Sequence, residues 1–80
     1  VVLYVTPWCG YCKKAAAHLR RRGVAFVERD IDSDPAAAAE LARKLAAAGL
    51  SGGGVPVLDV DGTVVIGFDR ARIDKLLDGR

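Results

Sequence analysis

Residues 1–12 have the sequence VVLYVTPWCGYC, which joins a short apolar run to a pair of cysteines. The β-branched run over residues 1–5 ends at Thr6-Pro7, a pattern that favours a strand buried on both faces of a sheet. Beyond it, apolar residues recur at helical spacing up to Gly23, and these are Cys12, Ala15, Ala16 and Leu19. Cys9 and Cys12 are therefore predicted to lie where the first strand passes into the first helix.

The sequence of the middle part of the chain indicates a strand, a helix and a loop. Residues 24–31 alternate in a way that is typical of a strand whose far end is polar. Asp34-Pro35 is a capping pair for a helix over residues 36–48, which ends at Gly49. Residues 50–54 form a glycine-rich loop that we expect to pack little and to move more than its neighbours.

The last third of the chain predicts a hairpin and a short helix. Asp61-Gly62 is a two-residue hairpin signal between strands over residues 56–60 and 64–66. Asp69 can cap a final helix that finishes near Asp78.

The predicted order is β-α-β-α-β-β-α. A right-handed first crossover makes strands one and two parallel, and the hairpin adds an antiparallel pair to the same sheet. The fold class is therefore α/β, a three-layer α/β/α domain with a four-stranded mixed sheet. We expect the first and last helices on one face and the middle helix on the other, with a core centred on Val2, Tyr4, Leu19, Phe26, Leu41, Leu45, Val57 and Ile73.

The composition of the chain argues against two classes of partner, nucleic acids and membranes. The chain has 80 residues, and its 12 Lys and Arg against 10 Asp and Glu give a formal net charge of +2, unlike the clustered basic excess of nucleic-acid-binding proteins. Its apolar runs are a few residues long, whereas a membrane-spanning helix needs about 20, and no secretory signal opens the chain. We predict one domain over residues 1–80, monomeric and cytoplasmic, with no nucleic-acid or membrane partner.

The cysteine pair predicts thiol-disulfide chemistry. In Cys9-Gly10-Tyr11-Cys12, the first sulfur lies at the amino end of the helix and the second lies one turn later. Unpaired amides and the helix dipole stabilise a thiolate at Cys9, with Lys13 and Lys14 nearby. We therefore predict Cys9, facing solvent, as the nucleophile and Cys12, pointing inward, as the resolving thiol.

Two other interpretations of the cysteine pair are open. A structural zinc ion needs two further ligands, and the one histidine of the chain is His18, so we expect no metal. A structural disulfide over so short a loop would stabilise little. His18 and the run Arg20-Arg21-Arg22 are predicted to form a solvated helix face.

The chain resembles the glutaredoxin family, in its short bacterial branch of glutaredoxin-like redoxins. The matching motifs are Thr6-Pro7-Trp8-Cys9-Gly10-Tyr11-Cys12, Gly54-Val55-Pro56, Asp61-Gly62 and Gly67-Phe68-Asp69. The resemblance implies a thioredoxin-like fold. It also implies a thiol-disulfide oxidoreductase that reduces protein disulfides, or mixed disulfides with low-molecular-weight thiols, through this dithiol site.

The resemblance also implies a substrate-binding surface. Pro56 is expected to be cis with its loop facing Cys9, although a trans proline opening an edge strand is the ordinary alternative. Val55 would offer its main chain to an extended thiol substrate. Trp8 and Tyr11 would flank the disulfide. Asp69 would receive the amino group of a γ-glutamyl thiol, and Gly67 and Phe68 are expected to belong to the same substrate-binding surface.

The electron donor is open at this point. Gly67-Phe68 looks like the redoxin branch, in which electrons come from thioredoxin reductase or from another low-molecular-weight thiol. The expected partners are disulfide-bearing proteins together with glutathione, a mycothiol-like thiol or thioredoxin reductase as donor, with no tightly bound cofactor. The alternatives are a glutathione-dependent [2Fe-2S] cluster carrier and a redox-sensing domain of a larger protein.

Overall fold

The computed structural model describes residues 1–51 and 54–80, and its elements follow the predicted order. The elements are β1 (Val2–Val5), α1 (Gly10–Arg21), β2 (Val27–Asp30), α2 (Pro35–Ala47), β3 (Val57–Val60), β4 (Thr63–Ile66) and α3 (Arg70–Asp78). The prediction of a loosely packed, moving loop at residues 50–54 includes Gly52 and Gly53, which lie outside the described residues.

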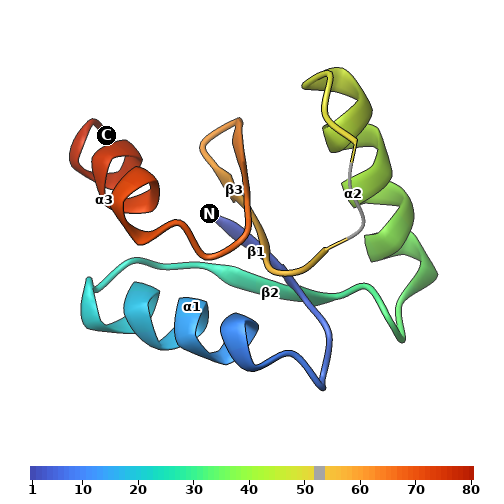
Figure 1. Cartoon of the computed structure of the whole chain (residues 1–80), viewed down its shortest axis with the longest axis horizontal. Helices are drawn as coiled ribbons and strands as arrows, with labels where there is room; N and C mark the ends of the chain where they lie inside the picture. The colour runs from blue at the N-terminus through green and yellow to red at the C-terminus, as the bar shows by residue number, and fades with distance from the viewer. Residues whose placement is uncertain (52–53) are drawn as a thin grey trace.

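One mixed sheet organises the chain, with strand order β2-β1-β3-β4. β1 pairs with β2 in parallel, with Val2 opposite Val27, whereas β1–β3 and β3–β4 are antiparallel. Helices α1 and α3 lie on one side of the sheet and α2 lies on the other (Figure 1). The predicted pairing directions and the placement of the three helices are confirmed.

Both faces of the central strands carry core residues, because neighbouring side chains of a strand point to opposite faces. Leu3 and Leu58 face α1 and α3, and Tyr4 and Val57 face α2. Of the predicted core, Tyr4, Leu19, Leu41, Val57 and Ile73 are buried, while Val2, Phe26 and Leu45 are half-buried at its margins. Leu3, Leu58 and Val65 are core residues that the prediction did not include.

Local signals in the sequence fix the turn and the cap that were predicted. Asp61 and Gly62 both have positive φ, 51° and 97°, as a tight hairpin of this kind requires. The Asp59 carboxylate accepts a hydrogen bond from the Gly62 amide at 2.7 Å. The Asp34 carboxylate accepts from the Ala36 amide at 3.0 Å, which caps α2.

The second strand is shorter than predicted. It was expected over residues 24–31, and the ladder covers Val27–Asp30. The ladder follows the register with β1, in which Val2 lies opposite Val27 and Val5 lies opposite Asp30. The Val27 amide donates to the Val1 carbonyl, just before the first residue of β1. Val24 and Phe26 pack against the core ahead of the ladder.

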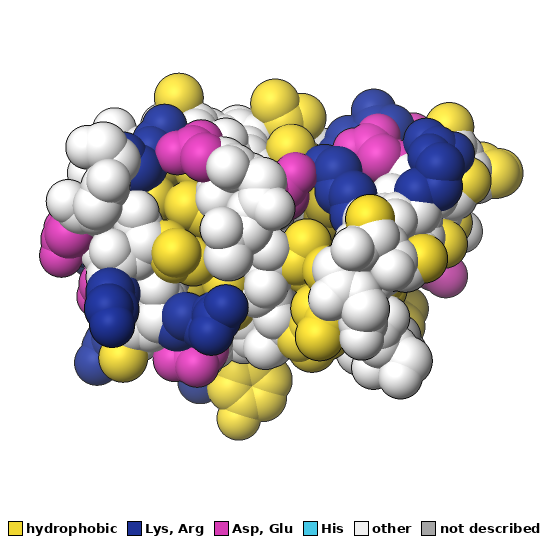
Figure 2. All heavy atoms as spheres, turned by 90° about the horizontal axis from the view of Figure 1, so that it is seen from above, with side chains coloured by type: hydrophobic (Ala, Val, Ile, Leu, Met, Phe, Trp, Pro, Cys, Tyr) yellow, Lys and Arg dark blue, Asp and Glu magenta, His cyan; other side chains and the backbone are white. Residues whose placement is uncertain are grey.

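A network of charged and polar side chains ties α2 to the sheet. The Tyr4 hydroxyl donates a hydrogen bond to Glu40, and Arg29 lies 3.2 Å from the same carboxylate. Lys44 contacts Asp59 of β3 at 2.7 Å and Glu40 at 3.4 Å. The space-filling view shows Lys and Arg side chains next to Asp and Glu side chains on the face that it presents (Figure 2).

Candidate active site

Cys9 caps α1 with its own sulfur. It has extended backbone geometry just before Gly10, and its Sγ accepts a hydrogen bond from the Cys12 amide at 3.1 Å. Side-chain oxygens usually fill this position, satisfying an amide that the helix leaves unpaired. A sulfur there lies at the positive end of the helix dipole.

The Val55 carbonyl covers Cys9 from the other side. The Cys9 thiol donates to this oxygen at 3.7 Å, a contact across 46 positions of sequence. Cys9 is consequently 7% exposed. Cys12 is 3% exposed, and both cysteines are free thiols. The expectation that Cys9 faces solvent is therefore wrong for this structure, because the segment before Pro56 closes over the sulfur.

The two thiols are unequal in their chemistry. Burial raises the pKa of the Cys12 thiol, and its hydrogen bond with Cys9 raises that pKa further, against an opposing contribution from the Thr6 backbone. Cys12 therefore stays protonated at neutral pH until something removes its proton.

Two aromatic rings next to the cysteines are open to solvent. Trp8 is 73% exposed and Tyr11 is 63% exposed. The Lys14 ammonium lies over the Tyr11 ring, 5.1 Å from its centroid. Within the described part of the chain, neither Lys13 nor Lys14 forms an ion pair. The first turn of α1 thus presents aromatic surface and free positive charge beside Cys9.

The two predicted substrate loops meet next to the cysteines. The Val55–Pro56 peptide bond is cis, as expected. The Gly67 amide donates to the Pro56 carbonyl at 2.8 Å, which places the segment from Gly67 beside the loop that covers Cys9. Asp69 caps α3 by accepting from the Arg72 amide at 3.1 Å, as predicted.

Phe68 is half-buried and packs against the protein core. Its ring packs against the core shared by α1 and α3 and meets the His18 ring in an edge-on contact, 5.8 Å between centroids. His18 is 8% exposed and lies 2.6 Å from Asp74. The prediction of a solvated face is therefore wrong for His18, because α3 packs over that side of α1. Arg20 and Arg22 are exposed, yet both are ion-paired.

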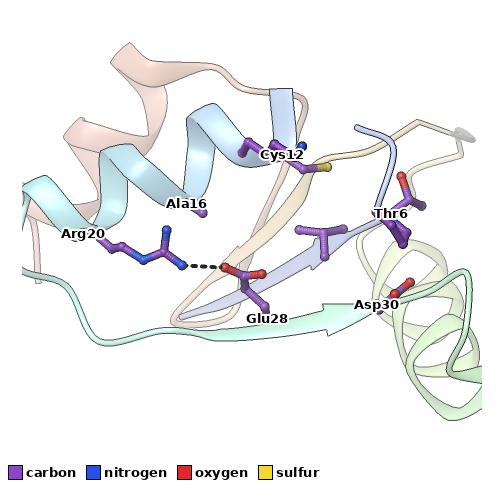
Figure 3. Close-up of a pocket in the computed structure, with 9 residues that line it drawn as sticks. Thr6, Cys12, Ala16, Arg20, Glu28 and Asp30 are labelled. Carbon is purple, nitrogen blue, oxygen red and sulfur yellow. Dashed lines mark hydrogen bonds and ion pairs between the residues drawn. The ribbon is translucent and has the colours of Figure 1, made fainter. Parts of the chain in front are cut away.

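A cleft of about 460 Å³ opens on the other side of Cys12, between α1 and β2 (Figure 3). The prediction from sequence did not find it, although Glu28 and Asp30 alternate on one face of their strand, which is a usable signal. The lining residues that matter chemically are Thr6, Cys12, Lys13, Arg20, Glu28 and Asp30.

Comparison with known proteins identifies the family. The glutaredoxin family model matches residues 1–65. A glutaredoxin-like 8.6 kDa protein in the rubredoxin operon of Clostridium pasteurianum is 35% identical over 78 residues, covering 98% of this chain and 97% of that protein. The chain belongs to the glutaredoxin family.

A second curated protein and two solved structures are also similar to this chain. A glutaredoxin of Pseudomonas aeruginosa is 52% identical over 44 residues, which are 55% of this chain and 52% of that protein. The solved structure of a point mutant of the thioredoxin-like protein BC3987 matches with a TM-score of 0.79 at 30% identity, over 95% of this chain and 96% of that one. A glutaredoxin from Archaeoglobus fulgidus shares the fold, with a TM-score of 0.76 at 23% identity, over 95% of this chain and 83% of that one.

Family and fold together confirm the thioredoxin-like architecture and indicate a function of the thiol-disulfide oxidoreductase type. In residues 1–51 and 54–80, no cluster of three or more His, Cys, Asp and Glu side chains is arranged to hold a metal ion. None of the helices in that same part of this glutaredoxin is long and apolar enough to cross a membrane.

Proposed function

We propose that this glutaredoxin reduces protein disulfides and mixed disulfides of low-molecular-weight thiols, with Cys9 as nucleophile and Cys12 as resolving thiol. The observation that carries the proposal is the position of Cys9 Sγ at the amino end of α1, where it accepts the Cys12 amide at 3.1 Å. The thiolate is the reactive form of cysteine, and a hydrogen bond from an amide stabilises it.

The exchange has two steps. The Cys9 thiolate attacks one sulfur of the substrate disulfide, forms a mixed disulfide, and expels the other sulfur as a thiolate that takes up a proton. Cys12 then loses its proton and attacks Cys9 Sγ, which releases the second substrate thiol and leaves a Cys9–Cys12 disulfide. Two electrons from a donor thiol or from thioredoxin reductase restore the dithiol.

The surroundings of Cys9 support a protein substrate. Trp8 and Tyr11 offer exposed aromatic surface, and Val55 and Gly67 bring main-chain groups beside the sulfur. A cation in the first turn of a helix opposes its dipole, so Lys13 weakens α1 slightly where it stands, and Lys14 follows it along the helix. Their placement is explained if they attract acidic groups that flank a substrate disulfide.

A turnover assay tests the proposal and identifies the donor. A disulfide substrate is supplied with NADPH and either glutathione with its reductase or thioredoxin reductase, and NADPH consumption is followed. We expect turnover with at least one donor and none in Cys9→Ser. Full turnover in Cys9→Ser would overturn the proposal, and so would absence of turnover with both donors and with mycothiol and its reductase supplied in their place.

A further inference from the structure

The resolving step of the proposed reaction poses a problem of proton removal. Cys12 is 3% exposed, and burial raises the pKa of its thiol. It must nevertheless become a thiolate to attack Cys9 Sγ, since the thiol is a poor nucleophile. A nearby base that takes this proton would remove the obstacle.

The cleft between α1 and β2 gives this buried thiol access to solvent. Cys12 and Ala16 line it from α1, and Thr6 lines it from the end of β1 (Figure 3). Its volume of about 460 Å³ has room for several water molecules, and Thr6, Glu28 and Asp30 in its lining offer them hydrogen-bonding groups.

Thr6 is a second sign that water enters the cleft. The residue is 7% exposed, and its hydroxyl has no hydrogen-bond partner within the described part of the chain. A buried hydroxyl without a partner is costly, so a water molecule in the cleft is the natural partner. Such a molecule would lie beside Cys12, which lines the same cleft.

Two carboxylates line the cleft, and they differ in how many of their oxygens are free to accept a proton. Asp30 Oδ1 already accepts hydrogen bonds from the Asp32 amide at 2.9 Å and the Ser33 amide at 3.3 Å, and the Asp32 bond lowers the pKa of Asp30. Glu28 has one contact among the described residues, an ion pair with Arg20 at 3.1 Å.

The negative charge of Glu28 also acts on Cys12 and raises the pKa of its thiol, an effect that ends once the carboxylate has taken up a proton. The charged and titratable groups around the Cys12 side of the cleft are Cys9, Lys13, Arg20, Glu28 and Asp30. Lys13 and Arg20 are cations and cannot accept a proton at neutral pH. Among these groups, Glu28 is left as the candidate base, with one of its oxygens paired to Arg20.

We propose that Glu28 accepts, through water in the cleft, the proton that Cys12 loses as it resolves the mixed disulfide. The inference rests on the proposed function. In the step, the Cys12 proton passes to a water molecule, which gives a proton to the Glu28 carboxylate. Cys12 Sγ then bonds to Cys9 Sγ, and the substrate sulfur leaves as a thiolate. Arg20 holds the Glu28 carboxylate over the cleft.

The experiment separates the two steps by rapid mixing of the reduced protein with dithiobis(nitrobenzoate), an aromatic disulfide that releases a yellow thiolate. Attack by Cys9 releases the first yellow thiolate, and resolution by Cys12 releases the second. Because this thiolate leaves easily, proton removal from Cys12 governs the second phase. The rates of both phases are measured across pH in wild type, Glu28→Gln, Glu28→Asp and Asp30→Asn.

We expect Glu28→Gln to leave the first phase unchanged and to slow the second about a hundredfold at neutral pH, the lower end of what a positioned base supplies. The wild-type second phase should be flat near neutrality with an acid limb. In Glu28→Gln it should rise continuously with pH, because hydroxide is then the remaining base. Glu28→Asp should recover part of the rate, and Asp30→Asn should behave as wild type.

A Glu28→Gln variant with a wild-type pH profile in the second phase would overturn the role of Glu28, and so would an Asp30→Asn variant that alone loses the acid limb. Both outcomes leave the proposed function standing, because the first phase reports Cys9 chemistry. Loss of the first phase from wild type would contradict the proposed function itself. Circular dichroism of Glu28→Gln checks that the variant is folded.

Discussion

His18 Nε2 lies 2.6 Å from Asp74 Oδ1, and this contact joins α1 to α3 across 56 positions of sequence. Arg22 donates to the same carboxylate oxygen at 2.8 Å. The His18 ring also packs against Phe68, which follows the glycine that bonds to the Pro56 carbonyl. The pair therefore supports the loop beside the cysteines as well as the packing of the two helices.

Asp74→Asn should lower the free energy of unfolding by about 1 kcal/mol at neutral pH, the usual net value of one hydrogen bond. The hydrogen bond with His18, and then that with Arg22, lowers the pKa of Asp74. A carboxyl with a lower pKa in the folded state adds stability above its unfolded pKa, and this stability is lost as pH falls through the folded pKa. The difference between wild type and variant in urea unfolding should therefore shrink below about pH 4.

Asp78→Asn is the matched control for this prediction. Asp78 also pairs with Arg22, but its side chain is 67% exposed, so the substitution should have little effect. A difference for Asp74→Asn that persists unchanged in acid would show that its charge is not what stabilises the helix pair.

Tyr4→Phe should raise the pKa of Glu40 and lower the urea midpoint at neutral pH. The Tyr4 hydroxyl is the main cause that lowers the pKa of Glu40, ahead of the contacts with Lys44 and Arg29. The lost stability belongs to the ionised carboxylate, so wild type and variant should converge in acid. An NMR titration of the Glu40 carboxyl checks the shift directly. Tyr11→Phe, at an exposed ring, should leave the titration as it is.

Leu58→Ala should cost about 2–5 kcal/mol of unfolding free energy, the range for truncating a fully buried leucine. Leu58 is 0% exposed and stands opposite Leu3 and Val65 in the neighbouring strands. Val27→Ala, at a position that is 58% exposed, should stay within about 0.5 kcal/mol of wild type. Equal midpoints for the two variants in urea would contradict the placement of the core.

The element order could be predicted because its signals are local. Asp34-Pro35 caps a helix and Asp61-Gly62 makes a tight turn through backbone preferences that neighbouring residues alone determine. The length of β2 could not be predicted, because a ladder extends only as far as its partner strand. Leu58 was missed because both faces of the central strands are covered, which alternation within one strand does not reveal.

In the candidate site, too, the features that neighbouring residues determine could be predicted, and those that distant residues determine could not. The spacing of Cys9 and Cys12 is local, and it predicted that Cys9 lies at the amino end of the helix with Cys12 one turn later. The burial of Cys9 depends on Val55, and that of His18 on Asp74, both far away in the sequence. The cleft beside Cys12 needs the sheet register that places Glu28 opposite Leu3, and thus required the fold.

Alkylation should distinguish the two thiols. Because burial raises the pKa of Cys12, iodoacetamide at neutral pH should modify Cys9 first, and Cys12 should react only as the pH becomes strongly alkaline. Peptide mass spectrometry after short exposures across pH reports the order. Labelling in guanidinium serves as the control, since both thiols should then react alike. Earlier labelling of Cys12 in the native protein would reverse the assigned roles.

Trapping of a mixed disulfide tests the exchange mechanism most directly. Cys12→Ser is incubated with a disulfide-bonded protein, and the products are separated without reductant and identified by mass spectrometry. Without a resolving thiol the reaction should stop after the first step. We predict a covalent adduct joined through Cys9, released by added thiol and absent from Cys9→Ser. An adduct that forms equally in Cys9→Ser, or no adduct in Cys12→Ser while wild type reduces the same substrate, would contradict the mechanism.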